Sequence, residues 1–283
     1  MMNCYLCGST KKGVRKGSVR DDALMAIVEC KNCGLVALDS STHIKVGHYE
    51  ESGMHGEAPQ SITTWLLESE QDDQRRIEML KVNLVNRKVL DFGCGAAGFV
   101  NKAQALTAKI VGVEPELRVH THWGGTLDLY RNLEEAGHGY DLITAFHVIE
   151  HLANPRTTLK DLAGHLGNEG RLVIEVPSSD DALLTLFDND SFQRFTYWSQ
   201  HLFLFNSKTL ALLAEQAGLR VIAVQQHQRY TLSNHLHWQS IGKPGGHLKW
   251  SFLDSPELNR AYAGALAAIA KCDTLIAYLE LAK

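Results

Sequence analysis

The residues with the clearest chemical pattern lie in a glycine-rich turn between an apolar run and a helical pattern. Gly93, Gly95 and Gly98 follow the run 88–92 in the spacing G-x-G-x-x-G. Glycine is needed where a backbone turns sharply or where a ligand approaches it closely. Glu114 ends a second apolar run 19 residues after Gly95, about the spacing of a carboxylate that binds ribose hydroxyls. These residues predict a nucleotide-cofactor site at a corner of a doubly wound α/β fold.

The charge of Asp91 narrows the choice of cofactor, because the glycine pattern alone also suits NAD and FAD. A carboxylate just before the glycine turn would repel a pyrophosphate, since the two charges have the same sign. It would attract the ammonium and sulfonium groups of S-adenosylmethionine. The sequence therefore favours S-adenosylmethionine over a dinucleotide.

Three segments in order resemble the motifs of class I S-adenosylmethionine-dependent methyltransferases. The stretch 89–95, V-L-D-F-G-C-G, resembles the first motif of that family. The stretches 140–143 and 145–152 resemble its fourth-strand motif, and 170–177 resembles its fifth strand. The resemblance covers roughly residues 84–226, and three matches in order are more specific than one glycine motif.

The resemblance implies a set of cofactor contacts at the carboxyl ends of the strands. The glycines would hold the methionine part, Glu114 the ribose, and Asn132 with Leu133 the adenine. Phe146 and His147 would pack on the other side of the cofactor. The expected cofactor-binding residues are Asp91, Phe92, Gly93, Gly95, Gly98, Glu114, Pro115, Asn132, Leu133, Phe146 and His147.

Four cysteines near the N-terminus form two C-x-x-C-G knuckles, Cys4 with Cys7 and Cys30 with Cys33. Two such turns complete a tetrahedral four-thiolate zinc site, which has no open position for chemistry and is therefore structural. A module of about 40 residues has too little core to fold unaided, so the metal would supply stability. A redox pair and a chance spacing are the alternatives.

Histidines supply the candidate catalytic groups, because their ordinary pKa lies near neutrality. His151 and His201 are the expected bases. Histidines in similar places serve as bases in nucleotide-sugar C-methyltransferases, a family that also has an N-terminal zinc-binding module. Gln200 stands where that family tends to have glutamate. His151 could instead cap its helix.

The expected acceptor side lies in an aromatic-rich connection, 178–201, and in the C-terminal part. A connection of this length is usually functional or carries its own helix, and it would form a lid or a substrate wall. The loop 243–247 could bind a phosphate or be an ordinary Pro-Gly turn, which the sequence favours. The expected substrate contacts are Tyr49, Tyr197, Trp198, Arg229, Asn234 and Lys243.

Alternating strands and helices predict a Rossmann-like core with a mostly parallel seven-stranded sheet and helices on both faces. The predicted strands are 88–92, 110–114, 126–130, 140–145, 172–176 and 221–224, with 229–238 as an antiparallel seventh. The predicted helices are 61–83, 99–108, 116–123, 155–165 and 208–216. The first helix would bury Ile62, Leu66, Leu67, Ile77, Leu80 and Val82, and a closing helix would extend its apolar face from Leu258 to Leu275.

The expected organisation has four parts. A zinc ribbon spans 1–40, a linker and helix 41–83, the S-adenosylmethionine-binding core 84–228, and a substrate-side segment with the closing helix 229–283.

Composition limits the classes of function. The chain has 283 residues, of which 45% are hydrophobic and 21% charged, and its net charge is −4. This acidic balance disfavours broad nucleic-acid binding. No apolar run reaches the roughly 18 residues of a membrane span, and no signal-peptide core is present. We expect a soluble cytoplasmic protein without a membrane partner, and the sequence leaves its oligomeric state open.

Together these features predict a methyltransferase that acts on a small activated metabolite, such as a nucleotide-linked sugar in polysaccharide or natural-product biosynthesis. An RNA base methyltransferase is an alternative, because five cations between Lys11 and Arg20 form a local basic cluster. A non-catalytic scaffold is another alternative, which the intact glycine turn and its two carboxylates disfavour. The acceptor atom, carbon, oxygen or nitrogen, stays open.

Overall fold

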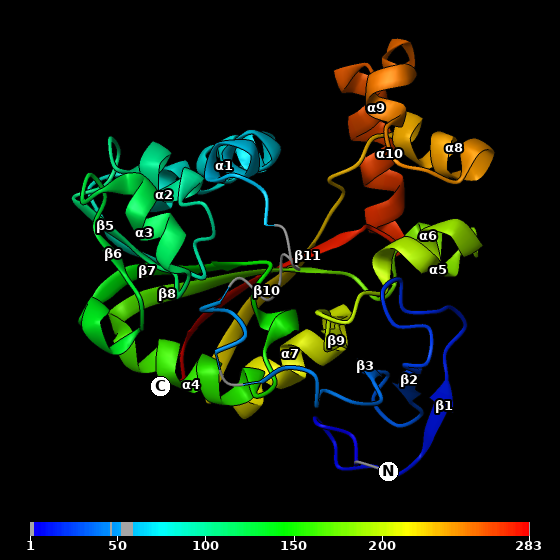
Figure 1. Ribbon diagram of the computed structural model, residues 1–283, viewed down its shortest axis with the longest axis horizontal. Coiled ribbons are helices and arrows are strands. Elements are labelled where there is room, and N and C mark those ends of the chain that lie inside the picture. The colour runs from blue at the N-terminus through cyan, green and yellow to red at the C-terminus, as the bar shows by residue number, and fades with distance from the viewer. Residues whose placement is uncertain (1–2, 46, 52–58, 283) are drawn as a thin grey trace.

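The protein is described here by a computed structural model that covers residues 3–45, 47–51 and 59–282 (Figure 1). Its centre is a seven-stranded sheet that confirms the predicted mostly parallel architecture. Five adjacent strands run parallel to one another, and the last strand of the chain is antiparallel to both of its neighbours. From edge to edge the strands are β10 (Leu219–His227), β11 (Thr274–Leu281), β8 (Leu166–Pro177), β7 (Tyr140–Phe146), β4 (Lys88–Phe92), β5 (Lys109–Val113) and β6 (Leu129–Tyr130).

Helices cover both faces of this sheet (Figure 1). One face is covered by α1 (Ile62–Leu84), α2 (Gly98–Ala103) and α3 (Leu117–Trp123). The other is covered by α4 (Pro155–His165) and α7 (Ser207–Gln216). Central strands are therefore buried on both faces, and Leu90 and Ile143 have no exposed surface. This double coverage explains why their sequences are continuous apolar runs.

The first long helix differs from its predicted burial. Leu67 and Val82 are 72% and 88% exposed, so the prediction that they face the core was wrong. Their place is taken by Asp73 and Arg76, which are buried. The spacing of the apolar residues correctly predicted a helix. Its buried face was misassigned because that face packs partly against a polar site and not only against an apolar core.

The N-terminal part is a small antiparallel sheet. Its strands are β1 (Lys12–Val14), β2 (Ile27–Cys30), β3 (Val36–Leu38) and β9 (Phe203–Leu204). The fourth strand comes from the connection after β8, far along the chain, and pairs antiparallel with β3. Part of the predicted linker, residues 46 and 52–58, lies outside the described residues.

The C-terminal part differs most from the sequence prediction. Segment 229–238 was predicted as the seventh strand, but it contains α8 (Leu232–Ile241). The seventh strand is β11, which pairs with β8 and β10. The closing helix α10 (Pro256–Ala268) ends before Leu275, which lies in that strand. Between α8 and α10 lie α9 (Gly246–Lys249) and η4 (Ser251–Leu253).

The connection 178–201 carries two helices of its own, α5 (Ala182–Thr185) and α6 (Asp190–Thr196). Two short helical turns, η2 (Glu134–Ala136) and η3 (Ile149–His151), follow β6 and β7. No helix among the described residues is both long and apolar enough to cross a membrane.

Candidate functional site

A cavity of about 1050 Å³ opens at the carboxyl ends of β4, β5 and β7. This is the edge at which ligands bind in open parallel sheets. All eleven residues predicted to contact the cofactor line it, and so do both predicted bases. The structure therefore brings together residues from positions 91 to 201 of the chain around one cavity.

The glycine turn presents bare backbone to this cavity. Gly93 and Gly95 have φ values of +68° and +55°, which residues other than glycine rarely adopt. A Cβ on Gly93 would lie 2.5 Å from Val148, and one on Gly95 would lie 2.8 Å from Trp65. The turn is thus packed from both sides, and only glycine leaves its backbone accessible to a ligand.

Two buried carboxylates flank the turn. Asp91 accepts a hydrogen bond of 2.7 Å from Thr144 Oγ1, and burial raises its pKa to about 7. Glu114 accepts hydrogen bonds from the backbone N–H groups of Gly95 and Glu116 at 2.9 and 3.1 Å, and burial raises its pKa to about 7 as well. Each carboxylate lacks a cationic partner at hydrogen-bond distance among the described residues, so both suit a ligand that brings a cation or hydroxyl groups.

His147 is held between two carboxylates. Its Nδ1 lies 3.2 Å from Glu150 Oε1, and its Nε2 lies 3.2 Å from Glu175 Oε1. Burial alone would lower the pKa of His147, but these two contacts raise it above its ordinary value. The residue adopts φ +55°, so its side chain is directed by a strained turn at the end of β7.

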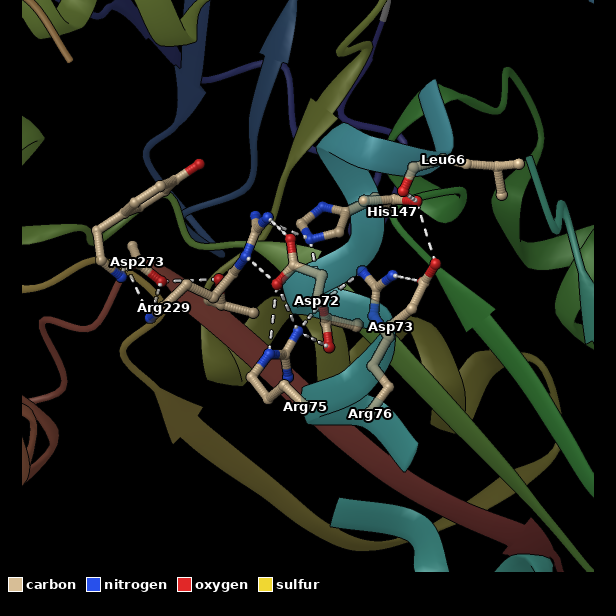
Figure 2. Close-up of polar contacts among 12 residues, drawn as sticks. Leu66, Asp72, Asp73, Arg75, Arg76, His147, Arg229 and Asp273 are labelled. Atoms are coloured by element: carbon tan, nitrogen blue, oxygen red, sulfur yellow. Dashed lines mark hydrogen bonds and ion pairs between the residues drawn. The ribbon is translucent and has the colours of Figure 1, made fainter. Parts of the chain in front are cut away.

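Charged residues of α1 form the floor behind His147, and the sequence analysis missed them (Figure 2). Glu175 is fully buried and accepts hydrogen bonds of 2.8 Å from both Arg75 Nη2 and Arg76 Nη2. Arg229 forms an ion pair with Asp72. The signal was the run 72–76, in which two aspartates and two arginines fall within one and a half turns of a helix.

The far half of the cavity is lined by aromatic and imidazole side chains. His151 and His201 lie with their ring centroids 5.0 Å apart, and Trp198 makes edge contacts with both rings. Tyr49 also lines the cavity, and its hydroxyl donates a 2.8 Å hydrogen bond to the carbonyl of His151. Burial lowers the pKa of His151 and lowers that of His201 to about 3. Both rings are therefore neutral near pH 7.

The six expected substrate contacts are divided between the cavity and other places. Tyr49, Trp198 and Arg229 line the cavity. Tyr197 is buried beside it, where its hydroxyl accepts a 2.9 Å hydrogen bond from Arg15 Nε.

Asn234 and Lys243 are not part of the cavity lining. The Oδ1 atom of Asn234 accepts hydrogen bonds from the N–H groups of Gly245 and Gly246 at 3.1 and 3.2 Å. These two N–H groups of the loop are therefore already hydrogen-bonded within the protein, which fits the ordinary-turn alternative rather than a phosphate site.

The four N-terminal cysteines converge as the knuckles predicted. The Sγ atoms of Cys4 and Cys33 lie 3.5 Å apart, as do those of Cys7 and Cys30, and all four lie within 4.8 Å of one another. None of the four is in a disulfide. Sulfur atoms bound to one tetrahedral zinc ion are about 3.8 Å apart, given Zn–S bonds of about 2.3 Å. The cluster has the size of a four-thiolate metal site.

Comparisons with known proteins agree with the fold. Residues 68–224 match the family described as Methyltransferase domain. A SAM dependent methyltransferase from Archaeoglobus fulgidus is 16% identical, with a TM-score of 0.53, and the match covers 76% of this chain and 98% of that one. A chain of the Haloferax volcanii complex between the Trm112 methyltransferase activator and a methyltransferase is 12% identical, with a TM-score of 0.51, covering 80% and 100%. At these identities the likeness shows the fold alone. No curated protein matches the sequence.

Proposed function

This S-adenosylmethionine-dependent methyltransferase belongs to the Methyltransferase domain family, and from that premise we propose that it methylates a small activated metabolite of the nucleotide-linked sugar class. One observation carries the proposal. The cavity of about 1050 Å³ joins the glycine turn to a compartment lined by Tyr49, His151, Trp198 and His201. This volume is at the upper end for pockets that hold one ligand, so a cofactor and a small acceptor fit together.

The cofactor half fits S-adenosylmethionine by its chemistry. The bare backbone of Gly93 and Gly95 would hold the methionine part, and the buried carboxylate of Asp91 would attract its ammonium group. Glu114 would accept hydrogen bonds from the ribose hydroxyls, with Asn132 and Leu133 at the adenine. When bound, the cofactor supplies a methyl group on a sulfonium, which is a good leaving group. The protein then contributes mainly positioning.

The acceptor half contributes proton handling. Nδ1 of His151 lies 2.8 Å from the carbonyl of Gln200, and Nδ1 of His201 lies 3.2 Å from that of Thr196. Each neutral ring therefore has its proton on Nδ1 and a lone pair on Nε2. Such a lone pair accepts the proton that an acceptor hydroxyl or carbon acid loses as its new bond to methyl forms. The ring of Trp198 would pack against the acceptor.

The N-terminal cluster supports a structural zinc ion held by Cys4, Cys7, Cys30 and Cys33. Each knuckle is closed by a glycine: Gly8 N–H donates to the Cys4 carbonyl, and Gly34 N–H to the Cys30 carbonyl, both at 2.9 Å. These turns aim two sulfurs inward from each side. Four thiolates complete the coordination, so the ion would stabilise the module and take no part in chemistry.

The basic cluster of the N-terminal module argues against RNA as the acceptor. The guanidinium of Arg15 donates to Ser179 and Tyr197, Lys16 lies 2.7 and 2.8 Å from two aspartates, and Arg20 lies over the ring of Trp198 at 4.3 Å. These three cations bind the protein itself. They are therefore not arranged as a free surface for phosphates.

Labelled methyl transfer tests the proposal. Purified protein and S-adenosylmethionine carrying a labelled methyl group are incubated with an extract of the source cells, and the RNA, protein and small-molecule fractions are counted. We expect label in the small-molecule fraction. In a second step, we expect methyl transfer when individual nucleoside diphosphate sugars replace the extract. Label in RNA would overturn the acceptor assignment. Absence of both transfer and cofactor binding would favour a non-catalytic scaffold.

Two variants then test the imidazoles. His151→Ala and His201→Ala should each lower turnover by about 10²- to 10⁴-fold, the usual contribution of a general base. Binding of S-adenosylhomocysteine should change little, because neither ring lies at the glycine turn. His122→Ala, on the outer helix α3, is the matched control and should keep full turnover. Unchanged turnover in both cavity variants would contradict the assignment.

A further inference from the structure

Three metal-ligating side chains meet in the acceptor half of the cavity. Ligand atoms of Glu150, His151 and His201 all lie within 4.8 Å of one another. Glu150 and His151 come from the turn η3 after β7, and His201 comes from the connection after α6. His201 lies 50 positions after His151 in the chain, so the fold holds distant residues together here. The four N-terminal cysteines form a separate group.

Both imidazoles present the nitrogen that a metal ion needs. Metal-ligating histidines usually donate the other ring N–H to a backbone carbonyl or a carboxylate, which fixes the tautomer. His151 and His201 have this arrangement, with Nδ1 facing the carbonyls of Gln200 and Thr196. The lone pair is therefore on Nε2 in both rings. For His151, Nε2 is the atom that faces Glu150, at 3.9 Å from Oε1.

Glu150 adds an independent observation. Its side chain is fully buried, and Oε2 has no hydrogen-bond partner among the described residues. Its other oxygen, Oε1, lies 3.2 Å from Nδ1 of His147. A buried carboxylate oxygen without a partner is costly, because it has lost water and gained nothing in exchange. A cation bound to Oε2 of Glu150 would remove that cost.

We propose that Glu150, His151 and His201 bind one divalent transition-metal ion beside the acceptor. Two imidazoles and one carboxylate form the ligand set of catalytic zinc sites and of ferrous sites with open coordination positions. The ion would bind an oxygen of the acceptor and lower the pKa of its hydroxyl, so that the proton passes to water as the oxygen takes the methyl group. The Nε2 lone pairs of the two imidazoles would then bind the ion, and water would replace them as the proton acceptor. This assignment rests on the proposed function, because it concerns the same acceptor.

The surrounding structure holds the three ligands in place. The main chain of His151 is fixed by the hydroxyl of Tyr49. The segment before His201 is fixed by Asp21, whose carboxylate accepts hydrogen bonds from Ser199 N and Ser199 Oγ at 3.0 and 2.6 Å. Ligands preorganised in this way lose little freedom when an ion binds.

Metal binding to the intact chain tests the site. The protein is first loaded with one equivalent of Zn²⁺, which the four thiolates take because they bind it most strongly. Co²⁺ alone is then titrated, and its absorption and stoichiometry are followed. We expect one Co²⁺ per chain, with the weak visible bands of nitrogen and oxygen ligands and without intense thiolate charge-transfer bands. No saturable binding of Co²⁺ would overturn the proposal.

Three variants locate the ion. His201→Ala and the isosteric Glu150→Gln should each weaken Co²⁺ binding by about 100-fold or more, since even outer partners of metal ligands contribute about 10- to 100-fold. His165→Ala is the control: Nδ1 of His165 also faces a backbone carbonyl, and its Nε2 is unpartnered, but this ring is not in the cluster. It should keep full affinity. Equal affinity for Co²⁺ in all three variants would overturn the site. Because Glu150→Gln keeps the shape of the side chain, a loss of Co²⁺ binding in this variant is not explained by misfolding.

Turnover separates this proposal from the function on which it rests. If methyl transfer requires a second metal equivalent and fails in Glu150→Gln, both are supported. If Co²⁺ does not bind, and transfer continues without that equivalent but is lost in His201→Ala, the rings are bases, and the metal site falls while the function stands. If Co²⁺ binds as expected but no fraction accepts methyl, the function falls and the site stands.

Discussion

Replacing Glu175 with glutamine should destabilise the protein by about 3 kcal/mol. The carboxylate is fully buried and is the centre of three cations. Its oxygens lie 2.8 and 2.9 Å from Arg75 Nη2, 2.8 Å from Arg76 Nη2 and 3.2 Å from His147 Nε2. Glutamine keeps the shape, but it removes the charge and turns an amide donor toward these donors.

The size of this loss in stability depends on the other carboxylates that stay next to the three cations. Removing one partner of a buried ion pair costs about 3–5 kcal/mol, because the remaining charge is left uncompensated. Each cation here retains a second carboxylate at 3.2 or 3.3 Å: Asp72 for Arg75, Asp73 for Arg76 and Glu150 for His147. The lower end of the range therefore applies.

Thermal and urea unfolding measure this change. At about 2–4 °C per kcal/mol, the Tm of Glu175→Gln should fall by about 6–12 °C. Glu280→Gln is the control, because Glu280 also binds an arginine on the same sheet, but Arg220 is 59% exposed. An exposed pair contributes about 1 kcal/mol at most. Equal falls for the two variants would refute the reasoning.

The same experiment has a pH arm. Burial alone would raise the pKa of Glu175, but its contacts with His147 and Arg76 hold it well below the ordinary 4.5. The unfolded chain therefore takes up this proton first as the pH falls. The stabilisation is present above about pH 4.5 and is lost below it. The difference in stability between wild type and Glu175→Gln should shrink on acidification, and a constant difference would contradict the pKa direction.

Three further predictions concern the cofactor half and the N-terminal module. Because burial raises the pKa of Asp91 to about 7, its carboxyl group ionises between about pH 6 and pH 8. The affinity for S-adenosylhomocysteine, measured by calorimetry, should therefore rise over this range. Asp91→Asn should abolish this pH dependence and weaken binding by about 10- to 100-fold. Gly95→Ala should weaken the same affinity by about tenfold or more, since the added Cβ would clash with Trp65. Gly124→Ala is the control and should leave the affinity unchanged, because Gly124 has a similar φ of +52° but open space around it. Cys30→Ser should lower bound zinc and acceptor turnover together but leave cofactor affinity unchanged; a parallel loss of cofactor affinity would show that the module supports the whole core.

The cofactor half could be predicted from sequence because its parts are local. Gly93, Gly95 and Asp91 lie within five positions, and the turn they form depends on backbone conformation alone. Glu114 directly follows the strand β5, which pairs with β4 and is joined to it by one short helix. Each of these positions follows from an element and its neighbour, so the sequence alone predicts that these four residues meet at one edge of the sheet.

The seventh strand could not be predicted for a physical reason. β11 inserts between β8 and β10, and its first four residues, 274–277, are all buried. Continuous burial removes the alternation that marks a strand, so Leu275 also fitted the period of the preceding helix. The polar run 229–238 alternates by chance, and its place as the helix α8 depends on packing against α9 and α10.

The acceptor half is built from segments that local rules cannot bring together. His151 follows β7, whereas Trp198 and His201 lie in a connection that is fixed by the N-terminal module. That module fixes it through Arg20 over Trp198, Asp21 on Ser199, and β3 paired with β9. The contacts reach the acceptor compartment and not the glycine turn. We therefore expect a zinc ion bound by the module to govern how the acceptor is held, while the binding of the cofactor depends on the core alone.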